Sequence, residues 1–237
     1  MIRTLLFDLD GTLLPVDTDQ FVESYLKILS KTMLKLMEPN YFIDKLMNST
    51  FATINNLDPT KTNQEVFWEH FSKDLPYDAK ELMLVFDTFY DIEFPKLSSI
   101  IKKNDLPAAI LETAHKKGYE IVIATSPIFP EKAILERLNW INARHFPYKF
   151  ITTYENMHFT KPHKEYYEEI MEVIGRRPEE CLMIGNDVEE DMIAGILGIK
   201  TFLVTDFILN RKNKAIEVDF SGSLKDLYTF VKNLKEV

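Results

Sequence analysis

The 237-residue chain lacks several features that define particular classes of protein. It has one cysteine, Cys181, so no disulfide can form within the chain, and this fits a reducing compartment. No apolar run approaches the roughly 18 residues of a membrane helix. The apolar N-terminal stretch is interrupted at Asp8, too early for the core of a signal peptide. We therefore expect a cytoplasmic protein without membrane association.

Basic runs are also absent, and the net charge is −9 at pH 7. This charge argues against a nucleic-acid partner bound through its phosphates. A small phosphorylated ligand remains compatible with it, because a local site can be positive inside an acidic protein. The composition, 46% hydrophobic and 27% charged, is typical of a globular protein. We expect the protein to be a monomer or a homodimer.

Short apolar runs bounded by polar, glycine or proline residues recur along the chain and predict strands. They lie at 4–7, 119–124, 150–152, 181–184 and 200–204. Helical patterns separate them at 108–117, 130–138, 164–174 and 187–197, and a glycine follows three of these helices. This alternation predicts an α/β fold with a Rossmann-like, doubly wound parallel sheet.

Residues 17–104 break the alternation and predict an inserted, all-helical cap domain. Helical stretches are expected near 19–37, 40–48, 63–72 and 78–90. The core domain would then comprise residues 1–16 and 105–237. Because ligands bind at the C-terminal ends of parallel strands, the cap would cover that edge. Most cap aromatics, such as Phe21, Tyr25, Trp68 and Phe71, are expected in the bundle core, while the segment SPIFPEKAILERLNW after the second strand is expected to shape the pocket floor.

The stretch LLFDLDGTLL places Asp8 and Asp10 at the end of a buried strand, on one face. Burying an unpaired carboxylate costs several kcal/mol, and two adjacent acids repel, so a cation or a proton must compensate them. An EF-hand loop also begins with this spacing, but it needs a glycine at position six and a glutamate at position twelve. Here these requirements are not met.

Polar residues also follow the other predicted strands. Thr125 and Ser126 end the strand at 119–124, and their hydroxyls can bind an anionic oxygen. Lys161 precedes a helix, where its charge opposes the helix dipole. In GNDVEED, Asp187 and Asp191 are four residues apart and would share a helix face. Glu189 and Glu190 are then expected to be solvated.

These residues are expected to meet at the C-terminal edge of the sheet. Four or five carboxylates around one lysine are too negative to be left uncompensated, and Mg²⁺ is the hard cation that prefers oxygen ligands. A metal, a lysine and a hydroxyl together can hold a phosphoryl group. The sequence therefore predicts a Mg²⁺ and phosphate site.

The same residues resemble the motifs of the haloacid dehalogenase (HAD) superfamily, in its phosphatase branch with a C1-type helical cap. DLDGT is similar to the first motif, Thr125 to the second, Lys161 to the third, and GNDVEED to the fourth. The resemblance implies a Mg²⁺-dependent hydrolase of small phosphate monoesters. Asp8 would be the nucleophile that forms an aspartyl-phosphate, and Asp10 the general acid and base.

The resemblance further implies that Thr125, Ser126 and Lys161 hold the phosphoryl oxygens. Mg²⁺ would be bound by Asp8, by Asp10 through its main-chain carbonyl, and by Asp187 and Asp191. The family's fourth motif most often begins Gly-Asp, whereas here Asn186 follows the glycine. Asn186 is therefore an alternative metal ligand to Asp187.

Other functions are compatible with the same sequence. True dehalogenases of the superfamily lack an acid at the position of Asp10, so its presence favours phosphate esters. Phosphonate cleavage would need a Schiff-base lysine in the cap, and none of Lys27, Lys31, Lys35 and Lys45 stands out. A phosphomutase, or a non-catalytic protein that binds metal or phosphate, are the remaining alternatives.

Overall fold

The computed structural model describes all residues, 1–237. Its six strands form one parallel sheet in the order β3-β2-β1-β4-β5-β6. The strands are β1 (Thr4–Phe7), β2 (Glu120–Ile123), β3 (Phe150–Ile151), β4 (Cys181–Gly185), β5 (Lys200–Val204) and β6 (Phe220–Gly222). All five predicted strands are present, and the α/β prediction is confirmed. The strand order reverses between β1 and β4, which is where doubly wound sheets bind their ligands.

Helices cover both faces of the sheet. They are α5 (Leu106–Lys116), α6 (Glu131–Trp140), α7 (Lys164–Ile174) and α8 (Leu224–Asn233). The chain also has three short 3₁₀ helices: η1 (Phe94–Ile100), which packs on α1, α4 and α6, η2 (Pro178–Glu180) and η3 (Met192–Leu197). Alternate residues of β1 face opposite sides. Leu5 packs in a cluster with residues of α5 and α8, whereas Leu6 packs with residues of α7.

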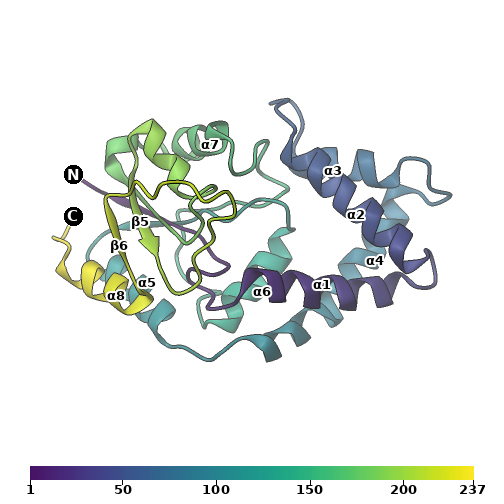
Figure 1. Cartoon of the computed structure of the whole chain (residues 1–237), viewed down its shortest axis with the longest axis horizontal. Helices are drawn as coiled ribbons and strands as arrows, with labels where there is room; N and C mark the ends of the chain where they lie inside the picture. The colour runs from purple at the N-terminus through teal and green to yellow at the C-terminus, as the bar shows by residue number, and fades with distance from the viewer.

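The inserted cap consists of helices only, as predicted. They are α1 (Thr18–Met33), α2 (Pro39–Ile54), α3 (Asn63–Ser72) and α4 (Ala79–Ile92). Figure 1 shows them at the end of the molecule opposite the two chain termini. Capping boxes at Thr62 and Asp78 fix the starts of α3 and α4. In each, the cap side chain accepts a hydrogen bond from the backbone amide three residues on, and the glutamate there accepts one from the cap residue's own amide. Cap and sheet side chains share one continuous apolar cluster, which attaches the cap to the core domain.

Several sequence expectations about elements were wrong. The segment expected to be helical at 187–197 is a tight turn followed by η3. Helix α2 continues to residue 54, six residues beyond the expected end at 48. Strand β6 and helix α8 were not predicted, although Leu224, Leu227 and Val231 give α8 an apolar stripe at helical spacing. No helix is both long and apolar enough to span a bilayer.

Candidate active site

A pocket of about 380 Å³ opens between the cap and the C-terminal ends of β1, β2 and β4. Seven residues singled out in the sequence line it: Asp8, Asp10, Thr125, Ser126, Asn186, Asp187 and Asp191. Lys161 does not line the pocket but contacts two of these residues, Asp8 and Asp191. The strand ends therefore bring together the residues that the sequence places far apart.

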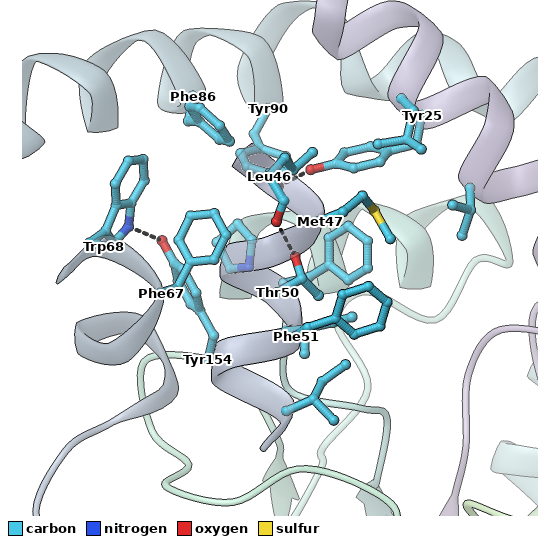
Figure 2. Close-up of a pocket in the computed structure, with 16 residues that line it drawn as sticks. Tyr25, Leu46, Met47, Thr50, Phe51, Phe67, Trp68, Phe86, Tyr90 and Tyr154 are labelled. Carbon is cyan, nitrogen blue, oxygen red and sulfur yellow. Dashed lines mark hydrogen bonds between the residues drawn. The ribbon is translucent and has the colours of Figure 1, made fainter. Parts of the chain in front are cut away.

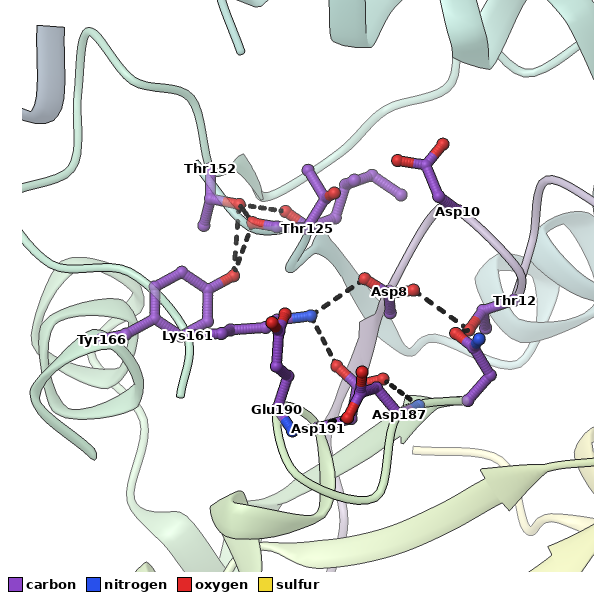
Figure 3. Close-up of polar contacts among 12 residues, drawn as sticks. Asp8, Asp10, Thr12, Thr125, Thr152, Lys161, Tyr166, Asp187, Glu190 and Asp191 are labelled. Carbon is purple, nitrogen blue, oxygen red and sulfur yellow. Dashed lines mark hydrogen bonds and ion pairs between the residues drawn. The ribbon is translucent and has the colours of Figure 1, made fainter. Parts of the chain in front are cut away.

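Lys161 is the buried cation of the site (Figure 3). Its Nζ lies 2.9 Å from Oδ1 of Asp8 and 2.5 Å from Oδ1 of Asp191, and the lysine side chain is 1% exposed. Burial acts to lower the pKa of Lys161, but the carboxylates of Asp191 and Asp8 outweigh it and raise the pKa well above its usual range. Lys161 is therefore charged and offsets the negative charge of Asp8.

Asp191 is engaged through both of its carboxylate oxygens. Oδ1 accepts from Lys161, and Oδ2 accepts from the backbone amide of Asp187 at 2.9 Å. Each oxygen thus accepts one hydrogen bond and keeps a second lone pair, so the expected role of Asp191 as a metal ligand stays a prediction. Gly185 makes the arrangement possible, since a Cβ at that position would lie 2.1 Å from Oδ2 of Asp191.

Asp187 closes the turn after β4. Its Oδ1 accepts from the backbone amides of Glu189 and Glu190 at 2.7 and 2.9 Å, and its Oδ2 lies 3.6 Å from Nη1 of Arg211. Burial raises the pKa of Asp187, and the two backbone hydrogen bonds oppose that rise. Asp187, which was expected to bind the metal, thus uses Oδ1 to hold the turn, and its Oδ2 lies near Arg211.

Of the two neighbouring glutamates that were expected to be solvated, Glu189 is buried and Glu190 is only partly exposed. Glu189 is buried and accepts from the backbone amides of Arg211 and Lys212 at 3.1 and 2.7 Å. Glu190 lines the pocket, and burial raises its pKa to about 7. Both therefore belong to the loops that surround the site.

Asn186 directs its amide oxygen into the site. Its Oδ1 lies 2.9 Å from the Thr12 hydroxyl, which is also 3.1 Å from Oδ2 of Asp8, while Nδ2 donates to the carbonyl of Phe207 at 2.7 Å. Since a hydroxyl has one proton, it cannot fully satisfy both oxygens. Gly11 keeps this space open, because a Cβ there would lie 2.4 Å from Nδ2 of Asn186.

Oδ2 of Asp8 and Oδ1 of Asn186, which share the Thr12 hydroxyl, suit a hard divalent cation. The structure has no cluster of three or more His, Cys, Asp or Glu side chains that could hold a metal ion. The available donors are instead mixed: the Asp8 carboxylate and the amide oxygen of Asn186, with the pocket open to water. Mg²⁺ usually takes one or two carboxylates and keeps several waters, so such a set suits it. The geometry favours Asn186 over Asp187 as the second protein ligand.

Asp10 forms a buried ion pair with Arg137, a residue that the sequence analysis missed. The pair joins Oδ2 of Asp10 to Nη1 of Arg137, whose side chain is fully buried on α6. Nε of Arg137 donates to the carbonyl of Ala133 at 3.2 Å, and the guanidinium lies 4.5 Å from the ring centroid of Phe129 and 5.8 Å from that of Phe21. The available signal was a lone arginine on the apolar face of 131–140.

Opposing effects act on the pKa of Asp10. Burial raises its pKa above the ordinary value, Arg137 opposes this rise, and the nearby Asp8 adds to it. Oδ1 of Asp10 is buried without a hydrogen-bond partner, as is Nη2 of Arg137. A carboxyl group held this way suits the donation of a proton.

Thr125 and Ser126 line the same pocket. The backbone carbonyl of Thr125 accepts from the hydroxyls of Thr152 and Tyr166 at 2.6 and 2.9 Å, which fixes the loop after β2. The Thr125 and Ser126 hydroxyls are not among the groups used in these bonds. Phe21, expected in the cap core, also lines the pocket, while Phe71 is fully buried as expected.

Comparison with known proteins agrees with the fold and shows the family. A family model described as haloacid dehalogenase-like hydrolase matches residues 2–198, and the chain belongs to this family. Pyrophosphatase PpaX from Anoxybacillus flavithermus is 28% identical over 92% of this chain and 91% of its own length. Among solved structures, the HAD phosphatase from Thermococcus onnurineus has a TM-score of 0.61 at 18% identity, with both chains fully covered. YfnB from Bacillus subtilis, solved with magnesium bound, has a TM-score of 0.57 at 22% identity and covers 98% of this chain and 99% of its own.

Proposed function

We propose that the protein is a Mg²⁺-dependent hydrolase of small phosphate monoesters that acts through an aspartyl-phosphate. The observation that carries the proposal is the buried Asp8–Lys161 pair beside a shielded Asp10, all at one end of the sheet. The core domain would comprise residues 1–16 and 105–237, with the cap, 17–104, admitting substrate and excluding water.

In the first step, a carboxylate oxygen of Asp8 attacks phosphorus, and the bond from phosphorus to the leaving oxygen breaks. Asp10 gives its proton to that oxygen, so the product leaves as a neutral alcohol. In the second step, Asp10, now a carboxylate, takes a proton from the attacking water. The bond between phosphorus and Asp8 then breaks and inorganic phosphate leaves. Each proton that Asp10 gives is thus recovered.

The remaining residues would bind the phosphoryl group. Lys161 and the hydroxyls of Thr125 and Ser126 would hold its oxygens. The residues that would hold Mg²⁺ are Asp8, Asp10 through its main-chain carbonyl, and Asn186. Asp187, through Oδ2, and Asp191 are the further candidates. When bound, the metal would supply positive charge that lets an anionic nucleophile approach an anionic ester.

Substitution of the nucleophile tests this proposal. The wild-type protein is expected to hydrolyse p-nitrophenyl phosphate in the presence of Mg²⁺ and to stop when EDTA is added. Asp8→Asn should reduce kcat at least ~1000-fold. Asp44→Asn is the matched control, because it makes the same change at an exposed position of the cap. Equal rates in the wild type and Asp8→Asn, over a broad panel of phosphorylated metabolites, would disprove the proposal.

Pyrophosphate is the second candidate substrate. The relative named above is a pyrophosphatase, and Arg211 at the pocket edge offers a cation for a second phosphate. Assaying pyrophosphate beside monoesters separates the two. A phosphomutase would instead produce an isomer without releasing phosphate, and a non-catalytic protein would bind without turnover. Phosphonate cleavage has no support, because no cap lysine lines the pocket.

A further inference from the structure

A second cavity, of about 230 Å³, lies inside the cap beside the candidate active site (Figure 2). Helices α1 to α4 form most of its wall, and the segment after β2 closes it from below. Fourteen of its sixteen lining residues are hydrophobic, and none carries a charge. Neither the phosphoryl-transfer steps nor the metal uses this cavity.

The cavity adjoins the active-site pocket. Four side chains line both spaces: Val22, Ile54, Ile128 and Phe129. The shared side chains place the two spaces next to each other, so a ligand that occupied both would hold its phosphoryl group at Asp8 and its other end in the cap. The group that enters would be the alcohol part of the ester, because the phosphoryl oxygens are bound at the strand ends.

The polar atoms of the cavity wall already have partners. The hydroxyls of Tyr25 and Tyr90 are 3.0 Å apart, and the Thr50 hydroxyl donates to the carbonyl of Leu46 at 2.9 Å. The Tyr154 hydroxyl accepts from the indole of Trp68 at 3.5 Å. A polyhydroxylated or charged group would lose its water in this cavity and gain few hydrogen bonds in return, which is unfavourable.

Aromatic rings dominate the rest of the wall. Phe67, Trp68 and Phe86 face the space, and the rings of Trp68 and Phe86 meet edge to face, with centroids 5.2 Å apart. Such surfaces bind flat or branched apolar groups through burial and ring contacts. The size is close to the lower end of small-molecule sites, which begin near 300 Å³.

We propose that this cavity binds the leaving group of the substrate, and that the substrate is a phosphate monoester of an apolar, preferably aromatic, alcohol. The inference rests on the proposed phosphatase function and adds its substrate class. Burying roughly 100 Å² of apolar leaving group should raise kcat/KM by about 100-fold over a polar ester of similar reactivity.

The kinetic test compares 2-phenylethyl phosphate with 2-hydroxyethyl phosphate and pyrophosphate, all with Mg²⁺. The wild type is expected to prefer the phenylethyl ester by about 100-fold in kcat/KM. Thr50→Phe fills the cavity and should remove at least ten-fold of this preference, with little effect on the hydroxyethyl ester. Asn48→Phe is the control, because it adds the same ring on the exposed side of α2. Equal kcat/KM for the two esters, or a preference for pyrophosphate, would overturn the inference.

A binding experiment separates this inference from the proposed function. Trp68 lines the cavity, so 2-phenylethanol should change the tryptophan emission of the wild type and of Asn48→Phe, but not that of Thr50→Phe. Such binding in a protein without phosphatase activity would support the cavity and reject the phosphatase. Turnover without this binding, and without ester preference, would retain the phosphatase and reject the substrate class.

Discussion

The ion pair between Asp10 and Arg137 leads to the most specific prediction about the chemistry. Arg137 is fully buried, and the Asp10 side chain is 17% exposed. Arg137→Met keeps most of the apolar volume but removes the charge. Leaving a buried carboxyl without its partner should destabilise the fold by about 3 to 5 kcal/mol.

The effect on proton transfer follows from the charge. Two opposite charges about 4 Å apart attract by about 4 kcal/mol at an effective dielectric constant of ~20. That energy corresponds to roughly three pH units, and the nearby Lys161 and solvent reduce it. Because Arg137 lowers the pKa of Asp10, its loss should keep Asp10 protonated to higher pH. The alkaline limb of kcat/KM should therefore move up by at least about one pH unit.

The assay is the pH profile of kcat/KM for 2-phenylethyl phosphate, whose alkoxide leaving group needs a proton. Arg137→Lys keeps the charge and should leave the alkaline limb near that of the wild type, although lysine lacks the planar fork. Arg176→Met is the control, since it removes a distant arginine. An unchanged limb in a folded Arg137→Met protein, or a shift to lower pH, would refute the reasoning.

Two further predictions concern stability and the turn after β4. Glu120 accepts two hydrogen bonds at 2.9 Å from Arg176, which lower its pKa to about 2 against the opposing effect of burial. The charged Glu120 should therefore contribute about 1 to 3 kcal/mol to the free energy of unfolding. This contribution is complete above pH ~4.5 and is lost as the pH falls toward 2. Urea unfolding of Glu120→Gln should lack this pH dependence, while its activity is unchanged. Gly185→Ala should displace Asp191 and reduce kcat by ten-fold or more. Gly195→Ala is the control and should retain activity, because a Cβ at Gly195 would meet its nearest atom at 3.8 Å. Equal rates in the two variants would contradict the close-contact argument.

The sequence was sufficient for those parts of the molecule that depend on local pattern. Apolar runs bounded by turn residues located the sheet strands, and the absence of such runs located the helical cap. Residues at strand ends meet because parallel strands align their C-terminal ends, which brings Asp8 beside the turn that carries Asp191. Lys161 contacts both from the loop between β3 and α7. Strand β6 escaped prediction because a three-residue edge strand has no pattern of its own.

The missed features depend on contacts between distant segments or on the backbone of one turn. Arg137 and Asp10 are 127 positions apart, and nothing local to either residue indicates the other. The spacing of Asp187 and Asp191 suggested a helix, but Asp187 instead accepts the amides of its own turn and so presents Asn186 to the site. Spacing alone cannot distinguish these two conformations.

The apolar cap cavity and the proton donor share one wall. The guanidinium of Arg137 packs on Phe129, which lines both cavities, and on Phe21, which lines the active-site pocket. Burial is the main cause of the raised pKa of Asp10. An apolar leaving group would displace water from this wall and extend the same low-dielectric surroundings. The apolar side chains proposed to select an apolar alcohol therefore also lie against the arginine that pairs with the proposed proton donor.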